Sequence, residues 1–268
     1  MCALNGQLKT RLAFSAEAIR SIIAHSLVTI VLDPMIEPTN LFDPVLYRSQ
    51  RKPLPEALGL PGWCYTSETF YRKEVDEIFL KTWLFIGHAA EIPTSGEYLC
   101  IDTPGGPVIV IRDQNATVRA FANTCRHRGA RLLEGSGRCE RAIVCPYHGW
   151  TYAFDGTLKG APAMDKTAGF EPAKYGLKPI KLSQWQDLMW INFDPHAASL
   201  ETYLGSMISD YSDYHFSDMV VTRRARYELA CNWKLVTDIA SEDYHTGTVH
   251  RTSVGTQLAY ELPDTHEN

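Results

Sequence analysis

The segment Cys125-Arg126-His127, followed after seventeen residues by Cys145-Pro146-Tyr147-His148, decides how this chain of 268 residues is interpreted. Each segment pairs one cysteine with one histidine. Two Cys and two His could form a tetrahedral zinc site, or they could be ordinary buried side chains. Zinc sites usually group two cysteines and then two histidines, whereas one Cys with one His in each loop suits a cluster with one all-sulfur and one all-nitrogen iron. The pattern therefore favours a two-iron redox centre.

The flanking residues indicate which class of protein carries this centre. The segments Cys125-Arg-His-Arg-Gly-Ala130 and Cys145-Pro-Tyr-His-Gly-Trp150 resemble the Rieske domains of bacterial ring-hydroxylating oxygenases. The resemblance implies a 2Fe-2S cluster. In it, Cys125 and Cys145 hold the iron that remains ferric, and His127 and His148 hold the iron that accepts the electron.

Rieske proteins of respiratory and photosynthetic cytochrome complexes differ at three positions. They carry an additional, mutually bridged cysteine in each loop, where this chain has Ala130 and Tyr147. They also carry a serine that donates a hydrogen bond to a cluster sulfide, where this chain has Trp150. Because hydrogen bonds to the sulfurs raise the potential, we expect a potential near the low end of the Rieske range. Such a potential suits electrons from NAD(P)H delivered through a reductase.

A second motif lies between residues 232 and 250. Its Asn-Trp-Lys start, its acidic run and its His-x4-His end resemble the mononuclear iron motif of Rieske non-heme iron oxygenase α subunits. On a continuous helix, Asp238, Glu242 and His245 stand at i, i+4 and i+7 and share one face. Two histidines near the end of an ordinary helix would mean little alone, but downstream of a Rieske motif they indicate a metal site.

The resemblance implies that His245 and His250 are ligands of a mononuclear Fe(II). Such an iron typically takes two histidines and one carboxylate and leaves positions open for O2 and substrate. Gly247 lies between the two histidines and offers a place for the helix to bend. In the family the third ligand, a carboxylate, lies far beyond residue 268. We therefore expect a chain truncated at its C-terminus and inactive as an isolated fragment.

Two acidic residues are predicted to serve catalysis. In the family, an acid three residues before the first iron-binding histidine bridges two subunits. The resemblance therefore implies that Glu242 accepts a hydrogen bond from His148 of the next protomer and orients His245. Asp238 is predicted to be a second acid of the catalytic site. The alternative is that Glu242 and Asp243 form a solvated acidic patch.

Composition limits the possible partners and locations. A net charge of −5 and a pI near 6.0 give no indication of binding to nucleic acid or to an anionic membrane surface. The most apolar segment, residues 18–32, is too short to span a bilayer and contains Arg20 and His25. Five of the seven cysteines lie outside the cluster motif without a disulfide framework, which favours a reducing, cytoplasmic location.

The pattern of apolar residues, together with the resemblance, predicts an α+β fold. We expect an antiparallel β-sandwich Rieske domain inserted before the start of an α/β mononuclear-iron catalytic domain. The expected boundaries are an N-terminal extension at 1–34, an introductory loop and helix at 35–82, the Rieske domain at 83–195 and an incomplete catalytic domain at 196–268. Short strands are expected at 83–87, 97–101, 107–112, 118–121, 142–145 and 188–193, with a hairpin turn at Asp155-Gly156. Helices are expected at 67–80, 200–214 and 238–245, with a strand-like segment at 220–229.

The resemblance implies a terminal oxygenase component. It would pass electrons from the cluster to the mononuclear iron and activate O2 for hydroxylation, dihydroxylation or demethylation. Aromatic compound catabolism is the family's usual role, and a glutamate at position 242 also suits quaternary ammonium substrates. The expected partners are the substrate, a reductase, a ferredoxin in some members, and further subunits as a homotrimer or an α3β3 assembly. The alternative is a Rieske ferredoxin-like electron carrier.

Five arginines near the cluster loops leave two interpretations open. They could receive an acidic ferredoxin or reductase, or they could form a solvated basic rim without a partner. The five are Arg126, Arg128, Arg131, Arg138 and Arg141.

Overall fold

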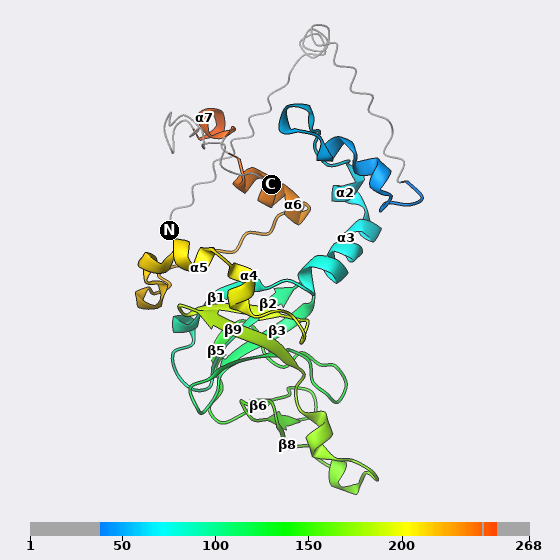
Figure 1. Cartoon of the computed structure of the whole chain (residues 1–268). Helices are drawn as coiled ribbons and strands as arrows, with labels where there is room; N and C mark the ends of the chain where they lie inside the picture. Colours follow the sequence, from blue (N-terminus) through cyan, green and yellow to red (C-terminus); the bar gives the residue numbers. More distant parts are fainter. Residues whose placement is uncertain (1–37, 243, 251–268) are drawn as a thin grey trace, which may run out of the picture. The chain divides into compact units, whose positions relative to one another are not determined.

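A computed structural model describes residues 38–242 and 244–250, so the expected extension at 1–34 and the segment after His250 lie outside the described part. Two compact units divide the chain between Trp63 and Cys64. In the described part of the first unit, residues 38–63, lie the 3-10 helices η1 (Pro44–Tyr47), η2 (Ser49–Arg51) and η3 (Leu54–Glu56). Both candidate metal centres belong to the second unit, drawn from cyan to red in Figure 1.

Two antiparallel sheets form the centre of the second unit. A seven-stranded sheet has the order β1-β10-β9-β4-β3-β2-β5, and a small sheet has the order β6-β7-β8. The strands are β1 (Leu84–His88), β2 (Glu97–Thr103), β3 (Gly106–Arg112), β4 (Val118–Ala122), β5 (Ser136–Arg138), β6 (Ile143–Val144), β7 (Thr151–Tyr152), β8 (Leu158–Gly160), β9 (Pro179–Trp185) and β10 (Leu188–Asn192). The predicted antiparallel β domain and the α+β class are confirmed.

Two apolar cores lie on opposite faces of β3. Val108 and Val110 pack in one core with residues of β1 and β10, including Ile86 and Met189. The alternate residues of β3 pack in the other core, which also contains the cysteines of the cluster loops and the small sheet. Because successive side chains of a strand point to opposite faces, the apolar run Val108–Ile111 of β3 can contribute to two cores.

Helical segments precede and follow the sheets. The helices are α2 (Trp63–Thr66), α3 (Glu68–Glu74), the π-helical turn η4 (Val75–Phe79), η5 (Ala89–Glu91), η6 (Met164–Lys166), η7 (Pro172–Tyr175), α4 (Leu200–Leu204), α5 (Met207–Asp210), η8 (Ser212–Tyr214), η9 (Phe216–Asp218), α6 (Trp233–Ala240) and α7 (Thr246–Val249). Ser67 caps α3 by accepting a hydrogen bond from the amide of Phe70 at 3.1 Å. The helix expected at 67–80 is therefore present, but its second half is a π turn.

Three expectations for the C-terminal third need correction. The helix expected at 200–214 is divided into α4, α5 and η8, and Gly205, with φ of 53°, ends α4. Residues 220–229, all of which the structure describes, form no strand. Their apolar and β-branched residues suit a strand, but a strand also needs a neighbour with which to form hydrogen bonds. The helix expected at 238–245 is replaced by the C-terminal end of α6, a turn, and α7.

Within the described ranges, no helix is both long enough and apolar enough to cross a membrane.

Candidate metal centres

Two loops of matching geometry carry the first candidate centre. The loop that follows β4 begins at Cys125, and the loop between β6 and β7 begins at Cys145. In each loop the cysteine amide donates to the carbonyl five residues later, at 2.8 Å. In each loop the cysteine carbonyl also accepts from the amide four residues later, at 3.0 Å. The same hydrogen-bond pattern therefore fixes one cysteine and one histidine in both loops.

A glycine in a left-handed conformation closes each loop. Gly129 has φ of 76° and Gly149 has φ of 69°, values that L-residues other than Asn and Asp rarely adopt. Space is available at both positions, because a Cβ would approach Thr124 only to 4.0 Å and Pro162 only to 3.8 Å. Backbone conformation rather than crowding therefore explains the glycines of the two motifs.

The two predicted histidine ligands lie together. The ring centroids of His127 and His148 are 4.7 Å apart, and the His127 ring stacks on buried Trp150 with an interplanar angle of 8°. Nδ1 of His127 is buried without a hydrogen-bond partner. Burial, and then the charges of His148 and Arg128, lower the pKa of His127. A buried, neutral imidazole nitrogen without a partner suits a metal ligand.

The two cysteines of these loops are the buried members of the donor set. Cys125 and Cys145 are 3% and 2% exposed, whereas His148 is exposed. No three Cys, His, Asp or Glu side chains within the described residues form a group around a single metal position. A 2Fe-2S cluster requires only two side chains on each iron. The donor set therefore fits that cluster.

Tyr152 is a contributor to this centre that the sequence reasoning missed. It is fully buried in β7, and its hydroxyl oxygen lies 3.3 Å from Sγ of Cys125 and 3.0 Å from the amide nitrogen of Arg126. Burial, and then the hydrogen bond with Cys125, raise the pKa of Tyr152. The residue therefore remains a phenol at neutral pH. Tyr152 stands two residues after Trp150, so on a strand the two side chains point to the same face, and this spacing could have indicated its place at the centre.

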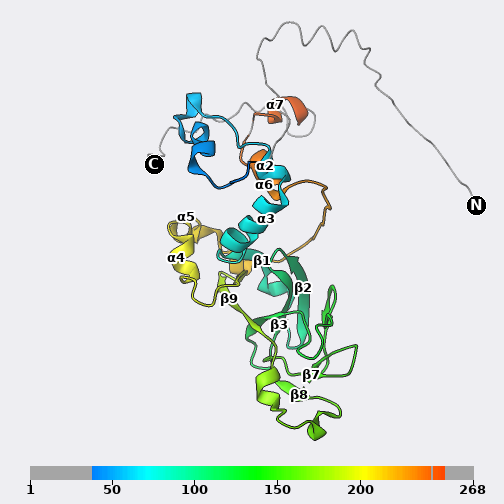
Figure 2. The same cartoon turned by 90° about the vertical axis from the view of Figure 1, so that its right-hand side faces the viewer.

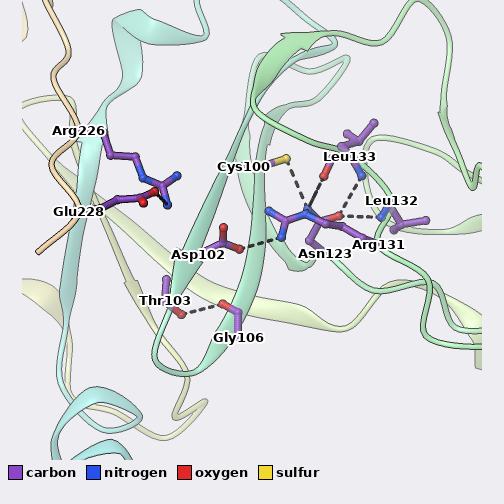
Figure 3. A network of polar contacts seen from close by, with 10 residues as sticks. All are labelled: Cys100, Asp102, Thr103, Gly106, Asn123, Arg131, Leu132, Leu133, Arg226 and Glu228. Carbon is purple, nitrogen blue, oxygen red and sulfur yellow. Dashed lines mark hydrogen bonds and ion pairs between the residues drawn. The ribbon is translucent and has the colours of Figure 1, made fainter. Parts of the chain in front are cut away.

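Asn123 fixes the chain beyond the first loop, as Figure 3 shows. Its buried carboxamide oxygen accepts from the amides of Leu132 and Leu133, each at 3.0 Å, and its nitrogen donates to the carbonyl of Leu133 at 2.7 Å. The same nitrogen lies 3.5 Å from Sγ of Cys100, whose pKa burial raises to about 11. Asn123, two residues before Cys125, was also missed, because its partners lie about ten residues away.

One of the five arginines near the loops already has an acidic partner. Arg131 forms an ion pair with Asp102 at 2.9 Å, also visible in Figure 3. Arg128, Arg138 and Arg141 are exposed. A basic rim is thus present, and the choice between a docking surface and a solvated rim stays open.

The second candidate centre lies after the end of α6. His245 and His250 have ring centroids 5.3 Å apart. Nδ1 of His245 lies 2.5 Å from Oε1 of Glu242, and Oε2 of Glu242 accepts from the His245 amide at 3.2 Å. The hydrogen bond with His245 lowers the pKa of Glu242. The structure thus brings three of the predicted residues together.

The helical explanation for this grouping was wrong. α6 ends at Ala240, Ser241 is its C-cap, and Gly247 lies inside α7 rather than at a bend. Asp238 accepts a hydrogen bond from the Tyr65 hydroxyl at 2.9 Å. The contacts of the described residues therefore place Asp238 with Tyr65 and not with the histidine pair.

The second donor set fits a mononuclear iron in part. The imidazole rings of His245 and His250 lie next to each other, and a carboxylate supports the ring of the first. A third ligand is not grouped with them among residues 38–242 and 244–250. The third ligand is expected beyond residue 268; the nearer acids Glu261, Asp264 and Glu267, too close to His250 in the sequence to replace it, lie outside the described residues.

Two family models match the segments of the chain that carry the two candidate centres. Residues 82–175 match the Rieske [2Fe-2S] domain family, and residues 216–266 match the ring hydroxylating alpha subunit (catalytic domain) family. The carnitine monooxygenase oxygenase subunit of Escherichia coli (strain K12) is 31% identical over 199 residues, covering 73% of this chain and 53% of that protein.

Two further relatives broaden the comparison. The biphenyl 2,3-dioxygenase subunit alpha of Rhodococcus jostii (strain RHA1) is 32% identical over 196 residues, covering 70% of this chain and 42% of that protein. A crystal structure of the apo form of a quaternary ammonium Rieske monooxygenase has a TM-score of 0.70 at 31% identity, covering 73% of this chain and 57% of that chain. The chain spans about half the length of the curated relatives it matches.

Proposed function

Since this chain belongs to the Rieske non-heme iron oxygenase α subunits, we propose that it serves as the terminal oxygenase component of a multicomponent enzyme. The observation that carries the proposal is the presence of two centres in one chain. The paired Cys-His loops leave Nδ1 of His127 without a partner, and the His245–His250 pair follows about one hundred residues later. A Rieske ferredoxin-like carrier would need only the first centre.

Each loop contributes one ligand to each iron of the first centre. The buried Cys125 and Cys145 would hold one iron, and His127 and His148 would hold the other. When bound, the cluster supplies single electrons and the mononuclear Fe(II) supplies a site where O2 is activated. With Cys125 held as a thiolate, the Tyr152 hydroxyl would donate a hydrogen bond to its Sγ, and Trp150 excludes water from one face of His127.

The second centre depends on His245, His250 and Glu242. The two imidazoles hold the iron, while Glu242 fixes the ring orientation of His245 through the 2.5 Å contact at Nδ1. A carboxylate, which the family resemblance places beyond residue 268, would complete the ligand set. Asp238, bonded to Tyr65, acts on this centre only through the position of α6.

A neighbouring subunit brings the two centres together. Glu242 retains 42% side-chain exposure, and His148 is exposed, so each is open to a partner molecule. The structure of a quaternary ammonium Rieske monooxygenase, 31% identical to this chain, gives insight into inter-subunit electron transfer. A ring of three subunits lets His148 of one copy meet Glu242 of the next.

The proposed substrate is a quaternary ammonium compound, with an aromatic compound as the second candidate. The first class is supported by the similarity to carnitine and glycine betaine monooxygenase oxygenase subunits and by the glutamate at position 242. The second is supported by the similarity to a biphenyl dioxygenase subunit. Electrons would come from NAD(P)H through a cytoplasmic reductase.

Iron stoichiometry tests the proposal. After anaerobic loading of a protein that carries the complete catalytic domain, we expect three irons per chain and a Rieske absorption spectrum. His245→Ala should lose one iron and keep the spectrum, whereas His127→Ala should lose the spectrum. Two irons in the parent chain, unchanged by His245→Ala, would instead identify a ferredoxin-like carrier.

A further inference from the structure

We propose that Glu74, on the helix that precedes the Rieske domain, is a positioning residue for the mononuclear iron centre. The inference rests on the proposed function, because it concerns the placement of His245. Glu74 lies more than 150 residues before that histidine in the sequence. It acts through α6, which starts at Trp233 and ends five residues before His245.

Both carboxylate oxygens of Glu74 bind the start of α6. Oε1 accepts from Nζ of Lys234 at 2.7 Å, and Oε2 accepts from the indole nitrogen of Trp233 at 3.1 Å. Asn232, the N-cap of α6, accepts from the same Nζ at 2.8 Å. Glu74 therefore contacts Trp233 and Lys234 directly, and it contacts Asn232 indirectly through Lys234.

This ion pair is buried and enclosed by aromatic rings. The side chains of Glu74 and Lys234 are 6% and 10% exposed. Nζ of Lys234 lies between 5.3 and 5.4 Å from the ring centroids of Tyr65, Phe70 and Trp233. A buried pair often adds little stability over apolar residues of the same volume, and its best-attested use is to select one arrangement. The arrangement selected here is the docking of α6 on α3.

The π turn η4 explains how the continuous helix formed by α3 and η4 contacts Trp233 of α6 at two positions. The amide of Leu80 donates to the carbonyl of Val75 at 2.9 Å, which is the i to i+5 bond of a π-helix. This wider turn brings residues five apart onto one face, so both Glu74 and Phe79 meet Trp233. The Phe79 ring contacts the Trp233 ring edge-on, with centroids 5.1 Å apart. π turns inside helices occur frequently at functional sites.

A second tie holds the other end of α6. The Tyr65 hydroxyl donates to Asp238, in the last turn of the helix. The helices α3 and α6 lie side by side in both views (Figures 1 and 2). Leu235, Val236 and Ile239 on α6 remain between 45% and 62% exposed. The polar contacts of α6 with α2 and α3 therefore fix the position of its C-terminal end. They thereby also fix the start of the turn that carries Glu242 and His245.

The test measures metal affinity separately at the two centres. The cluster-loaded chain, with its second centre empty, is titrated with Co(II) as a probe for the His245 site. The cluster is followed by its visible absorption. Glu74→Gln should weaken Co(II) binding at least tenfold, as loss of a supporting contact around a metal ligand typically does. It should leave the cluster intact and speed amide exchange of residues 244–250. Trp233→Phe should have a smaller effect in the same direction.

Two further variants separate positioning from general stability. Asp113→Asn breaks another ion pair of a buried carboxylate, with the 41% exposed Arg119, in the Rieske domain. It should lower stability and leave Co(II) affinity unchanged. The double variant Glu74→Leu/Lys234→Met removes the charged pair together and should fold, yet bind Co(II) weakly, because Trp233 loses its acceptor.

The outcomes distinguish the inference from the proposed function. Parent-like Co(II) affinity in Glu74→Gln, or in the double variant, overturns the positioning role. If Glu74→Gln and the double variant both lose the cluster together with Co(II) binding, the positioning role is also overturned, and Glu74 is a general stability residue. A parent chain whose Co(II) binding does not depend on His245 refutes the second centre itself.

Discussion

Removing the Tyr152 hydroxyl should lower the reduction potential of the cluster. The Arg126 amide can only donate, so it uses a lone pair of the Tyr152 oxygen at 3.0 Å and leaves the phenolic proton for Sγ of Cys125 at 3.3 Å. Reduction adds negative charge to the cluster and strengthens that bond. Tyr152→Phe therefore destabilises the reduced state more than the oxidised state.

The magnitude follows from the strength of one hydrogen bond to a charged group, about 1.5–3 kcal/mol. If about 1 kcal/mol of it develops on reduction, the potential falls by about 40 mV, given 59 mV per tenfold change for one electron. The same substitution leaves the buried Arg126 amide without an acceptor, which costs about 1–3 kcal/mol of stability.

A redox titration monitored by EPR measures the potential, and urea unfolding measures the stability. Tyr175→Phe is the matched control, because Tyr175 belongs to the same core and packs against Trp150 and Phe170. Its potential should equal that of the parent. An unchanged potential in Tyr152→Phe, with the cluster fully loaded, would refute the assignment of the hydroxyl proton to Cys125.

Substitutions at three further positions test the residues around the cluster. Burial would raise the pKa of Asp113, but Arg119 and two backbone amides outweigh burial and lower that pKa. Asp113→Asn should therefore destabilise the protein at pH 7. The difference from the parent should shrink as the pH falls below about 4, where the parent also loses the charge. Urea unfolding at both pH values checks this. Asn123→Ala should cost on the order of 3 kcal/mol by leaving two amides unpaired, while Asn123→Asp, which keeps the acceptor, should cost less in thermal melts. Gly149→Ala should cost about 1–2 kcal/mol through its positive φ, and Gly149→Asn less, as read by melting temperature and cluster content.

The cluster loops could be predicted from the sequence because their determinants are local. A cysteine, a histidine and a glycine within five residues specify each turn, and Gly149 has the left-handed conformation that its loop needs. Short strands with alternating apolar residues were predictable for the same reason. The partners of Asn123 and Tyr152 were not, since pairing across ten or more residues leaves no local pattern.

The second centre shows the limit of periodicity. The i, i+4, i+7 spacing of Asp238, Glu242 and His245 suits one helix, yet α6 stops at Ala240 and a turn brings only the last two together. The pairing of Glu74 with Lys234 is equally hidden, because the residues are 160 positions apart. Residues 220–229 have strand composition, but pairing is a property of two segments.

β3 has a consequence for how the protein survives without its cluster. Its residues Val108, Ile109, Val110 and Ile111 are each 0% exposed, two in the core that holds the cysteines and two in the core beyond. A strand whose side chains pack into both cores cannot lose its packing on one face alone. We therefore expect an apo chain to weaken as a whole rather than to fray at its loops, so that proteases in the cell distinguish loaded from empty protein.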